Sequence, residues 1–324
     1  MTVSLYAGML GSAGGQDGVG TAAQFNQPSD VAQDLAGNVY VADYGNKTVR
    51  RITIDGRVTT LAGAAGQSGS TDGAGAAARF AGPTGIAVDA AGNVYVSDAP
   101  NHTLRRISAA GVVTTIAGAA GQSVFVNGDA ASARLVSPGS LAVDASGSIY
   151  FVDLLQGPDG QRDYLVRKRA PDGTISTFAG NPNAPALVYG RDAKETRFVG
   201  ILGLAADATG NLYVSEGSTV ANSNIGTIRK FDREGRAVPI GADARGVVGV
   251  AYPRDISVDP DGTMYVVSNG LDQPSPSFIT RYRTLLRVSP DGKIVTTIAG
   301  GSDISTVDGS LASSRFTDPT SVAV

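Results

Sequence analysis

A short pattern recurs along this chain, and its recurrence constrains the fold more than any other feature. The clearest copy is the stretch 82–118, where four runs rich in β-branched and aromatic residues are separated by turns that carry Gly, Asn or Asp. Short runs between turns of this kind predict a four-stranded antiparallel meander. No long helix is expected, because Gly or Pro interrupts every window before three helical turns could form.

The pattern occurs five times, at intervals of 55, 55, 63 and 52 residues. Its second run reads NVYVAD, NVYVSD, SIYFVD, NLYVSE and TMYVVS in the successive copies. Its first aspartate falls at Asp34, Asp89, Asp144, Asp207 and Asp259. A small sheet repeated in this way buries its faces only against its neighbours, so the sequence predicts an all-β β-propeller.

The pattern DxxGNVYVxDxxNxxxRRI resembles the NHL repeat, and the loop DGxGxAARFxxPxG resembles that of bacterial NHL-type propellers. The resemblance covers essentially the whole chain. It implies an architecture related to gluconolactonase-like and strictosidine-synthase-like propellers. It leaves the function open, since one fold hosts binders, lyases and hydrolases.

We expect one domain, 1–324, that forms a six-bladed propeller of NHL type. Its five complete four-stranded blades are predicted at 28–63, 83–118, 138–180, 203–241 and 253–300. An incomplete sixth blade is expected from the N-terminal strand 2–8 (TVSLYAG, like VTTLAG) and the C-terminal strand 318–324 (DPTSVAV, like a first strand). Such a split blade removes an open edge.

The two middle strands of that sixth blade are absent from the sequence. Either the chain stops short of its natural end, which we favour, or the two terminal strands pair directly. An incomplete sixth blade would leave an edge able to accept a strand from another chain.

Composition narrows the function classes. Only 17% of residues are charged and the net charge is −3, a poor match to nucleic acid. No apolar run reaches transmembrane length, so membrane insertion is not expected. The chain has no cysteine, hence no disulfide framework or thiolate metal site. The N-terminal stretch MTVSLYAGML lacks a basic region and a long apolar core, so we do not expect it to be a signal peptide. The compartment stays open, with an extracytoplasmic location favoured.

Two residue types recur once in each complete blade. A tyrosine lies on the second strand and an arginine on the third, and alternation in an antiparallel pair predicts that both face the same side of the sheet. We interpret them as structural struts, with the arginine stacked on the ring and paired to a carboxylate. The residues are Tyr40, Tyr95, Tyr150, Tyr213, Tyr265, Arg50, Arg105, Arg167, Arg229 and Arg287.

The carboxylates and the loops also have structural interpretations. The aspartates that end the second strand, such as Asp43, are expected to accept backbone N–H groups of the turn that follows. In the DGxGxxARF loop, the aromatic residue is expected to fill the gap between blades and the arginine to pair with a loop carboxylate.

Catalysis is limited by what the sequence lacks. His102 is the only histidine, so the amidating lyase and the streptogramin lyase, which depend on His, find no match. There is no G-x-S-x-G elbow and no EF-hand pattern. A calcium-dependent lactonase of the gluconolactonase-like type remains an alternative, although its Glu-Gly-Pro opening is missing. Its metal ligands would be Asp30, Glu216, Asp255 and Asn269.

The turn between strands two and three separates the blades into two groups. It is short in the first two blades and long in the others, at 154–164, 217–226 and 269–282. Long loops on a rigid scaffold are frequent sites of function. We therefore predict a non-catalytic module, without cofactor, that binds a protein or a glycan there. An RNA-binding NHL module is a second alternative, disfavoured by the charge. The candidate contacts are Tyr44, Tyr164, Asn224, Phe278 and Tyr282.

Overall fold

The computed structural model describes residues 2–156, 160, 162–181, 192–198, 200–217, 225–241, 248–275, 278–281, 283–302 and 306–324, and of 225, 271–275 and 278–281 it describes the backbone alone. Five short turns of 3-10 helix interrupt this otherwise all-β part of the chain. None of its helices is long and apolar enough to span a lipid bilayer. The fold has two compact units: Leu5–Gln156 with Leu165–Phe178, and Met1–Ser4 with Gly157–Tyr164 and Ala179–Val324.

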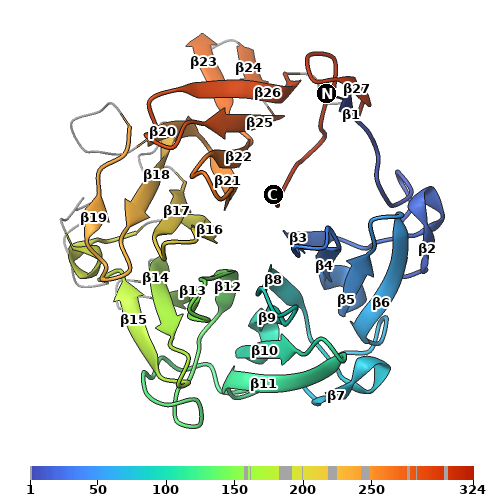
Figure 1. Ribbon diagram of the computed structural model, residues 1–324, viewed down its shortest axis with the longest axis vertical. Helices are drawn as coiled ribbons and strands as arrows, with labels where there is room; N and C mark the ends of the chain where they lie inside the picture. The colour runs from blue at the N-terminus through green and yellow to red at the C-terminus, as the bar shows by residue number, and fades with distance from the viewer. Residues whose placement is uncertain are drawn as a thin grey trace. The chain divides into compact units, whose positions relative to one another are not determined.

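Blades one and two have the same strand order, in which a two-residue strand of the preceding loop pairs with the fourth strand (Figure 1). Blade one contains β3 (Pro28–Gln33), β4 (Val39–Asp43), β5 (Thr48–Ile52) and β6 (Arg57–Gly63), extended by β2 (Gly18–Val19). Blade two contains β8 (Pro83–Val88), β9 (Val94–Asp98), β10 (Thr103–Ile107) and β11 (Val112–Gly118), extended by β7 (Gly73–Ala74).

Blades three to five keep the four-stranded plan. Blade three contains β12 (Pro138–Val143), β13 (Ile149–Gln156), β14 (Arg162–Arg169) and β15 (Ile175–Ala179). Blade four contains β16 (Ile201–Ala206), β17 (Leu212–Glu216), β18 (Ile225–Phe231) and β19 (Ala237–Val238), and β20 (Val248–Ala251) also pairs with β18. Blade five contains β21 (Pro253–Val258), β22 (Met264–Ser268), β25 (Arg283–Val288) and β26 (Val295–Gly301). The predicted all-β propeller with five blades is confirmed.

The recurring aspartate closes the hairpin between the first and second strands. In blade one, Asp34 Oδ1 accepts hydrogen bonds from the backbone N–H groups of Ala36 at 3.0 Å and Asn38 at 2.8 Å. Gly37 between them has φ 81°, a left-handed conformation that costs glycine little. The same bonds recur at Asp89, Asp144, Asp207 and Asp259. Local turn chemistry therefore sets the register of this hairpin in every blade.

Within each unit, neighbouring blades bury their apolar faces against each other. One cluster joins Val49 of blade one to Val96 of blade two. A second cluster joins Leu104 of blade two to Phe151 of blade three. In the other unit, blades four and five share a cluster that includes Met264 and Val266. This packing is the reason for the repeat, since each sheet gains its core from the next.

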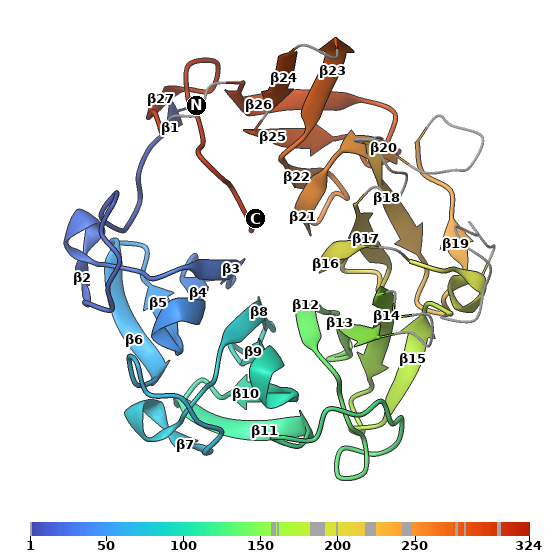
Figure 2. The same ribbon diagram turned by 180° about the vertical axis from the view of Figure 1, so that it is seen from behind.

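Both ends of the chain belong to the second unit. Near the N-terminus, β1 (Thr2–Val3) pairs antiparallel with β27 (Gly309–Ser310), and Figure 2 shows the two strands side by side. The C-terminal segment 318–324 runs from β27 to β21. There the Val322 N–H donates to Asp255 Oδ2 at 2.9 Å, and the Val324 N–H donates to Ser257 Oγ at 3.3 Å.

Candidate functional site

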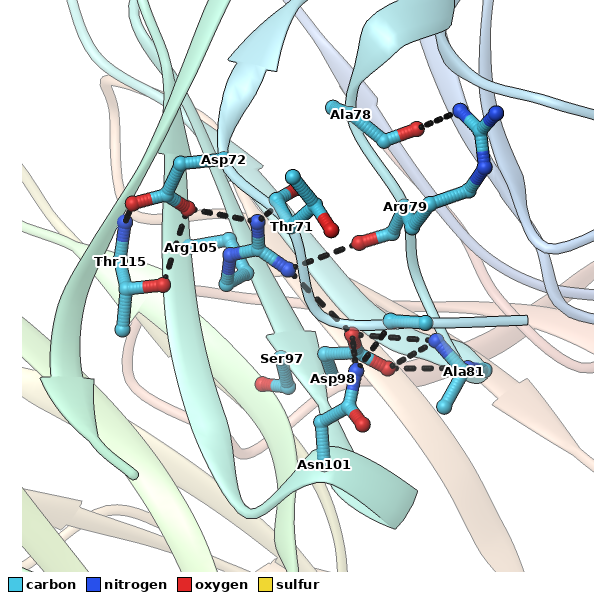
Figure 3. A network of polar contacts seen from close by, with 12 residues as sticks. Thr71, Asp72, Ala78, Arg79, Ala81, Ser97, Asp98, Asn101, Arg105 and Thr115 are labelled. Atoms are coloured by element: carbon cyan, nitrogen blue, oxygen red, sulfur yellow. Dashed lines mark hydrogen bonds and ion pairs between the residues drawn. The ribbon is translucent and has the colours of Figure 1, made fainter. Parts of the chain in front are cut away.

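A buried arginine on the third strand ties each of the first three blades to the loop that precedes it. In blade two, Arg105 is wholly buried. Its guanidinium donates to Asp72 Oδ1 at 2.7 Å and to the carbonyl oxygens of Thr71 and Arg79. It also lies 3.6 Å from Asp98 Oδ2, so two carboxylates flank one cation (Figure 3). Charge-assisted bonds of this kind are strong when they are shielded from water.

We call this arrangement the arginine strut: the arginine, the carboxylate that ends strand two, a polar side chain of the preceding loop, and an aromatic ring facing the guanidinium. The ring lies 4.7–5.2 Å from the guanidinium carbon. The members are Arg50, Asp43, Asp17 and Phe25 in blade one, Arg105, Asp98, Asp72 and Phe80 in blade two, and Arg167, Asp153, Asn127 and Phe125 in blade three.

Blade four keeps the arginine, a polar loop side chain and the ring of the strut, whereas blade five departs from it. Arg229 keeps its position in blade four, donates to Thr196 Oγ1 at 2.9 Å and faces the Phe198 ring at 5.2 Å. In blade five, Ser268 pairs with Thr284, so the register places Leu286 where the strut arginine would be. The assignment of Arg287 to the recurring arginine was therefore wrong by one residue.

The predicted stacking of the recurring tyrosines on the strut arginines is also wrong. Tyr40 pairs across the sheet with Arg51, whereas Arg50 pairs with Val41. Because neighbouring residues point to opposite faces, Tyr40 and Arg50 cannot meet. Tyr95 and Tyr213 have the same register, opposite Arg106 and Lys230. Tyr265 does lie opposite Arg287, but Arg287 is not the strut residue.

The tyrosine hydroxyl instead supports the hairpin aspartate. In blades one to four the hydroxyl donates to the aspartate carboxylate of the same blade, at distances of 2.9–3.3 Å. The pairs are Tyr40–Asp34, Tyr95–Asp89, Tyr150–Asp144 and Tyr213–Asp207. Burial, with Asp207 close by, raises the pKa of Tyr213. These tyrosines therefore have a structural role.

The aspartate that ends strand two bonds mainly backward along the chain. Asp98 accepts hydrogen bonds from the backbone N–H groups of Ala81 and Gly82 in the preceding loop. The following turn supplies the Asn101 side chain at 2.6 Å and no backbone donor that we observe. The predicted backbone donors were thus placed in the wrong loop. Burial raises the pKa of Asp98, although these bonds oppose the shift.

Two of the proposed metal ligands, Asp30 and Asp255, stand at equivalent positions, each third in a first strand. Asp30 accepts the backbone N–H groups of Val31 at 2.9 Å and Ile86 at 2.8 Å, and so holds blade one to blade two. Asp255 in the other unit holds Val322 in the same way. Burial raises the pKa of Asp255 to about 6. Asp30 therefore links the first strands of blades one and two, and Asp255 links the first strand of blade five to the C-terminal segment.

The other two candidate ligands have separate partners. Glu216 is buried at the end of β17, where Thr227 Oγ1 lies at 3.5 Å. The Asn269 amide donates to Asp318 Oδ1 at 2.7 Å. Within the described residues, no group of three or more His, Cys, Asp or Glu side chains is placed to hold a metal ion. The structure does not bring these four residues together as a ligand set.

The predicted partner contacts have different surroundings. Tyr44 is 39% exposed, at the start of a 3-10 turn in the first unit. Tyr164 of the second unit is half-buried and bridges to Phe198. Asn224, Tyr282 and the side chain of Phe278 lie outside the described residues.

Sequence reasoning missed a buried ion pair at the base of the long turn of blade three. Arg197 Nη2 lies 2.9 Å from Asp163 Oδ1, and the Asp163 side chain is 2% exposed. Neither residue belongs to the strut. Asp163 has no counterpart in the short turns of blades one and two, and that lack of recurrence is the signal that could have singled it out.

The lone histidine has a backbone role. His102 follows a 3-10 turn with φ 58°, and its Nδ1 lies 2.5 Å from the Val136 carbonyl oxygen. Lys47 occupies the same position in blade one, with φ 60°. Since a lysine serves equally well there, the position is defined by its left-handed backbone, and no catalytic triad can be built around His102 from these contacts.

Comparison with known proteins agrees with this architecture. Residues 25–52 and 80–107 match the NHL repeat. A search of curated protein sequences gave no match. A Bacteroides thetaiotaomicron protein of unknown function is similar in structure, with 19% identity, a TM-score of 0.64, and coverage of 100% of this chain and 70% of that one.

Two gluconolactonase structures are also similar. One, from Xanthomonas campestris, has 19% identity and a TM-score of 0.52 over 86% of this chain and 78% of its own. The other, a putative gluconolactonase, has 15% identity and a TM-score of 0.52 over 91% of this chain and 81% of its own. Identities this low establish the fold alone. The chain is thus a β-propeller whose first two blades match the NHL repeat.

Proposed function

We propose that this propeller is a non-catalytic binding or scaffolding module that recognises a protein or a glycan through the long turns of blades three to five. In blades one and two the corresponding turn is a single 3-10 turn, Tyr44–Asn46 or Ala99–Asn101. Residues 157–164 of the long turn of blade three belong to the same unit as blades four and five. An extracytoplasmic location in a bacterium and the absence of a cofactor are parts of this proposal.

The observation that carries the proposal is that the long turns of blades three and five contain paired strands. The middle strands of blade three, β13 and β14, lengthen to eight residues each. Blade five carries a further hairpin, in which β23 (Leu271–Ser275) pairs with β24 (Phe278–Arg281). Ordering a backbone costs conformational entropy. Insertions that had merely drifted in length would have no reason to form strands, and a rigid extension suits recognition.

A calcium-dependent lactonase is the competing enzyme, because two similar structures are named gluconolactonases. Its candidate ligands would first have to release other partners. Asp30 would lose the Ile86 N–H and Asp255 the Val322 N–H. Separating a buried carboxylate from its donors costs about 1–3 kcal/mol for each bond. The binding role requires no such rearrangement.

We also infer that the propeller has six blades, with 2–8 as the fourth strand and 318–324 as the first strand of the sixth. Val3 pairs with Gly309 as Val58 pairs with Gly18 in blade one. The Val322 N–H is held by Asp255 as the Ile86 N–H is held by Asp30. Both terminal segments thus make the contacts that the repeat assigns to those strands.

Exchange of turns between blades tests the binding proposal. Residues 269–282 are replaced by the short turn 99–102, and the matched control replaces 44–47 by the same turn. Wild type and both variants are then screened on a glycan array and a displayed peptide library. We expect binding that the blade-five exchange abolishes and the blade-one exchange retains, with both variants folded by circular dichroism.

The same proteins separate the competing functions. Calcium-dependent hydrolysis in a panel of lactones and esters, lost in Asp255→Ala, would replace the binding proposal by the lactonase. Salt-sensitive RNA binding that survives the blade-five exchange would favour the nucleic-acid alternative.

A further inference from the structure

Arg169 breaks the repeat at a position that is otherwise apolar. It is the last residue of β14 and lies two residues after the strut arginine of blade three. The same position holds Ile52 in blade one, Ile107 in blade two and Phe231 in blade four, and all three are buried. A cation that replaces a buried apolar side chain loses part of its hydration. Such a departure from the local pattern is expected where a residue serves function more than folding.

The Arg169 side chain is half-buried and points into the interface between blades two and three. Its Nε donates to the carbonyl oxygen of Ile116 in β11 of blade two at 3.3 Å, and its Nη1 donates to the carbonyl oxygen of Ala170 at 3.4 Å. Both bonds are longer than is usual for N–H donors. More than half of the five N–H donors of this guanidinium therefore have no acceptor among the described residues.

Arg106 reaches the same interface from blade two. It lies opposite Tyr95 on the neighbouring strand, and cross-strand partners project from the same face of a sheet. Tyr95 packs against the apolar cluster that joins blade two to Leu141 and Phe151 of blade three. Arg106 therefore faces blade three, where its exposed side chain donates from Nη2 to Asn93 Oδ1 at 2.7 Å.

The two guanidinium groups lie near one hydroxyl group. Burial and the hydrogen bond to Asp89 raise the pKa of Tyr95, and the positive charges of Arg106 and Arg169 both oppose this rise. Burial lowers the pKa of Arg169, and the charge of Arg106 adds to that shift. Charges influence a titration in this way only at close range. The interface thus brings together two cations from neighbouring blades.

The nearby carboxylates are occupied by other donors. Asp89 accepts four hydrogen bonds, three from its own hairpin and one from the Tyr95 hydroxyl. Asp172, in the turn after Arg169, accepts a backbone N–H of that turn at 2.8 Å. Among the residues that the structure describes, no carboxylate forms an ion pair with Arg106 or Arg169, whereas the strut arginines of blades one to three each have one.

We propose that Arg106 and Arg169 bind a phosphate group at the interface between blades two and three. Two guanidinium groups match the charge of a divalent oxyanion, and each can offer it two parallel N–H donors. The site lies at the end of blade two opposite to the turn Ala99–Asn101, because the other two turns of a four-stranded meander share one end. It is therefore separate from the recognition proposed above.

The interface between blades one and two provides an internal comparison. Arg51 there takes the position of Arg106, since it lies opposite Tyr40 and donates to Asn38 Oδ1 at 3.1 Å. The residue that blade two contributes in place of Arg169 is Ile107, which is wholly buried. This interface has one cation where the next has two, so we expect no phosphate to bind there.

Titration of the intact chain with inorganic phosphate, at an ionic strength held constant with chloride, tests the proposal. Proton–nitrogen correlation spectra follow the arginine Nε–H groups and the backbone amides of 89–95 and 169–173. We expect saturable shifts that Arg169→Ile abolishes. That variant restores the residue of blades one and two, so the fold is retained. Arg106→Gln should weaken binding about tenfold or more, because a charge-assisted pair is lost. Arg51→Gln is the matched control and leaves the affinity unchanged.

Two further probes identify the ion. Acetate carries one charge and should bind more weakly than phosphate. Methyl phosphate that binds as tightly as phosphate indicates the phosphoryl group of a larger ligand, and a preference for inorganic phosphate indicates the free ion. The inference is overturned by the absence of saturable shifts, by equal binding of acetate and phosphate, or by binding that persists in Arg169→Ile. A loss in Arg51→Gln as large as that in Arg106→Gln overturns it as well.

Discussion

Blades two and five are built from the same repeat but differ at the turn between their middle strands. In blade two, Asp98 and Arg105 are wholly buried in the strut, and the turn is one 3-10 turn. In blade five, Ser268 and Leu286 take those positions, and a strand-paired hairpin follows. In blade five, the loss of the strut side chains is thus accompanied by a longer turn between the middle strands.

Blade three shows which part of the network controls the turn. It keeps the strut, with Arg167 2.8 Å from Asp153, and still has a long turn. What it lacks is the turn asparagine: Asn101 in blade two donates to Asp98 and to the Gly69 carbonyl oxygen. The asparagine fastens the turn itself, whereas the arginine fastens the sheet to its loop. A blade can therefore lengthen its turn and keep its strut.

The largest effect is expected from breaking the strut in blade two. Arg105→Met leaves Asp98 buried without its cation, so the free energy of unfolding should fall by about 3–5 kcal/mol. Leu286→Met at the same position in blade five should cost less than about 1.5 kcal/mol, because it conserves volume in an apolar site. Urea denaturation measures both. Equal losses would contradict the distinction between the two blades.

A second feature of blade five is its buried contact with the C-terminal segment, in which the Val322 N–H donates to Asp255. Burial raises the pKa of Asp255 to about 6, while an exposed aspartate titrates near pH 4. Between these values the folded state keeps a proton that the unfolded state has released. Protonated Asp255 therefore contributes roughly 3 kcal/mol to the free energy of unfolding. This contribution is complete below about pH 4 and is lost as the pH rises through 6.

Asp255→Asn should remove this dependence of stability on pH, so the stability of wild type relative to the variant should decline between pH 4 and pH 7 in chemical denaturation.

Asp89→Asn is the control, for which the pH dependence of stability has the opposite sign. Burial alone would raise the pKa of Asp89, but hydrogen bonds from Asn93 and Tyr95 lower it. Its contribution is present at neutral pH and is lost on acidification. A wild-type protein insensitive to pH in this range would refute the buried link at Asp255.

The fold was predictable because its signals are local and repeated. The hairpin aspartates such as Asp34 act on residues only two and four positions away, and the apolar alternation follows the strands directly. The strut was predictable only in part. Arg50 bonds to Asp17 and Asp43, which come from different parts of the chain. The sequence shows each recurrence but not which side of the sheet it faces.

The misplaced residues have one physical cause. The pair Arg50–Arg51 offers two registers, and a shift of one residue moves a side chain to the other face. The sequence TVRRI does not show which of its two arginines is buried. In blade five, LLRVS contains a single arginine, so a sequence alignment places Arg287 opposite Arg50. The contacts proposed for the long turns have a different difficulty, because those turns do not repeat and no second copy in the sequence constrains their structure.

The finest distinction between blades two and five can be tested by rebuilding the strut where it is missing. Leu286→Arg alone introduces a buried charge and should destabilise blade five by about 3 kcal/mol. Ser268→Asp alone buries a carboxylate at the facing position. The double variant places both charges in the register that Arg105 and Asp98 occupy, so it should be more stable than the two single effects predict, by about 1–2 kcal/mol.

A double-mutant cycle by urea denaturation measures that coupling, and Leu285→Arg with Ser268→Asp is the control, because Leu285 is the neighbouring residue and faces the opposite side of β25. A coupling in the Leu286 cycle alone would show that blade five retains the strut geometry and has lost only its side chains. No coupling would mean that the strut needs its loop half as well, since Thr71, Asp72 and Arg79 supply three of the four groups that receive Arg105. In that case, restoring the arginine and the aspartate would not rebuild the strut in blade five. The difference between the two blades would then lie in the loop that precedes each of them.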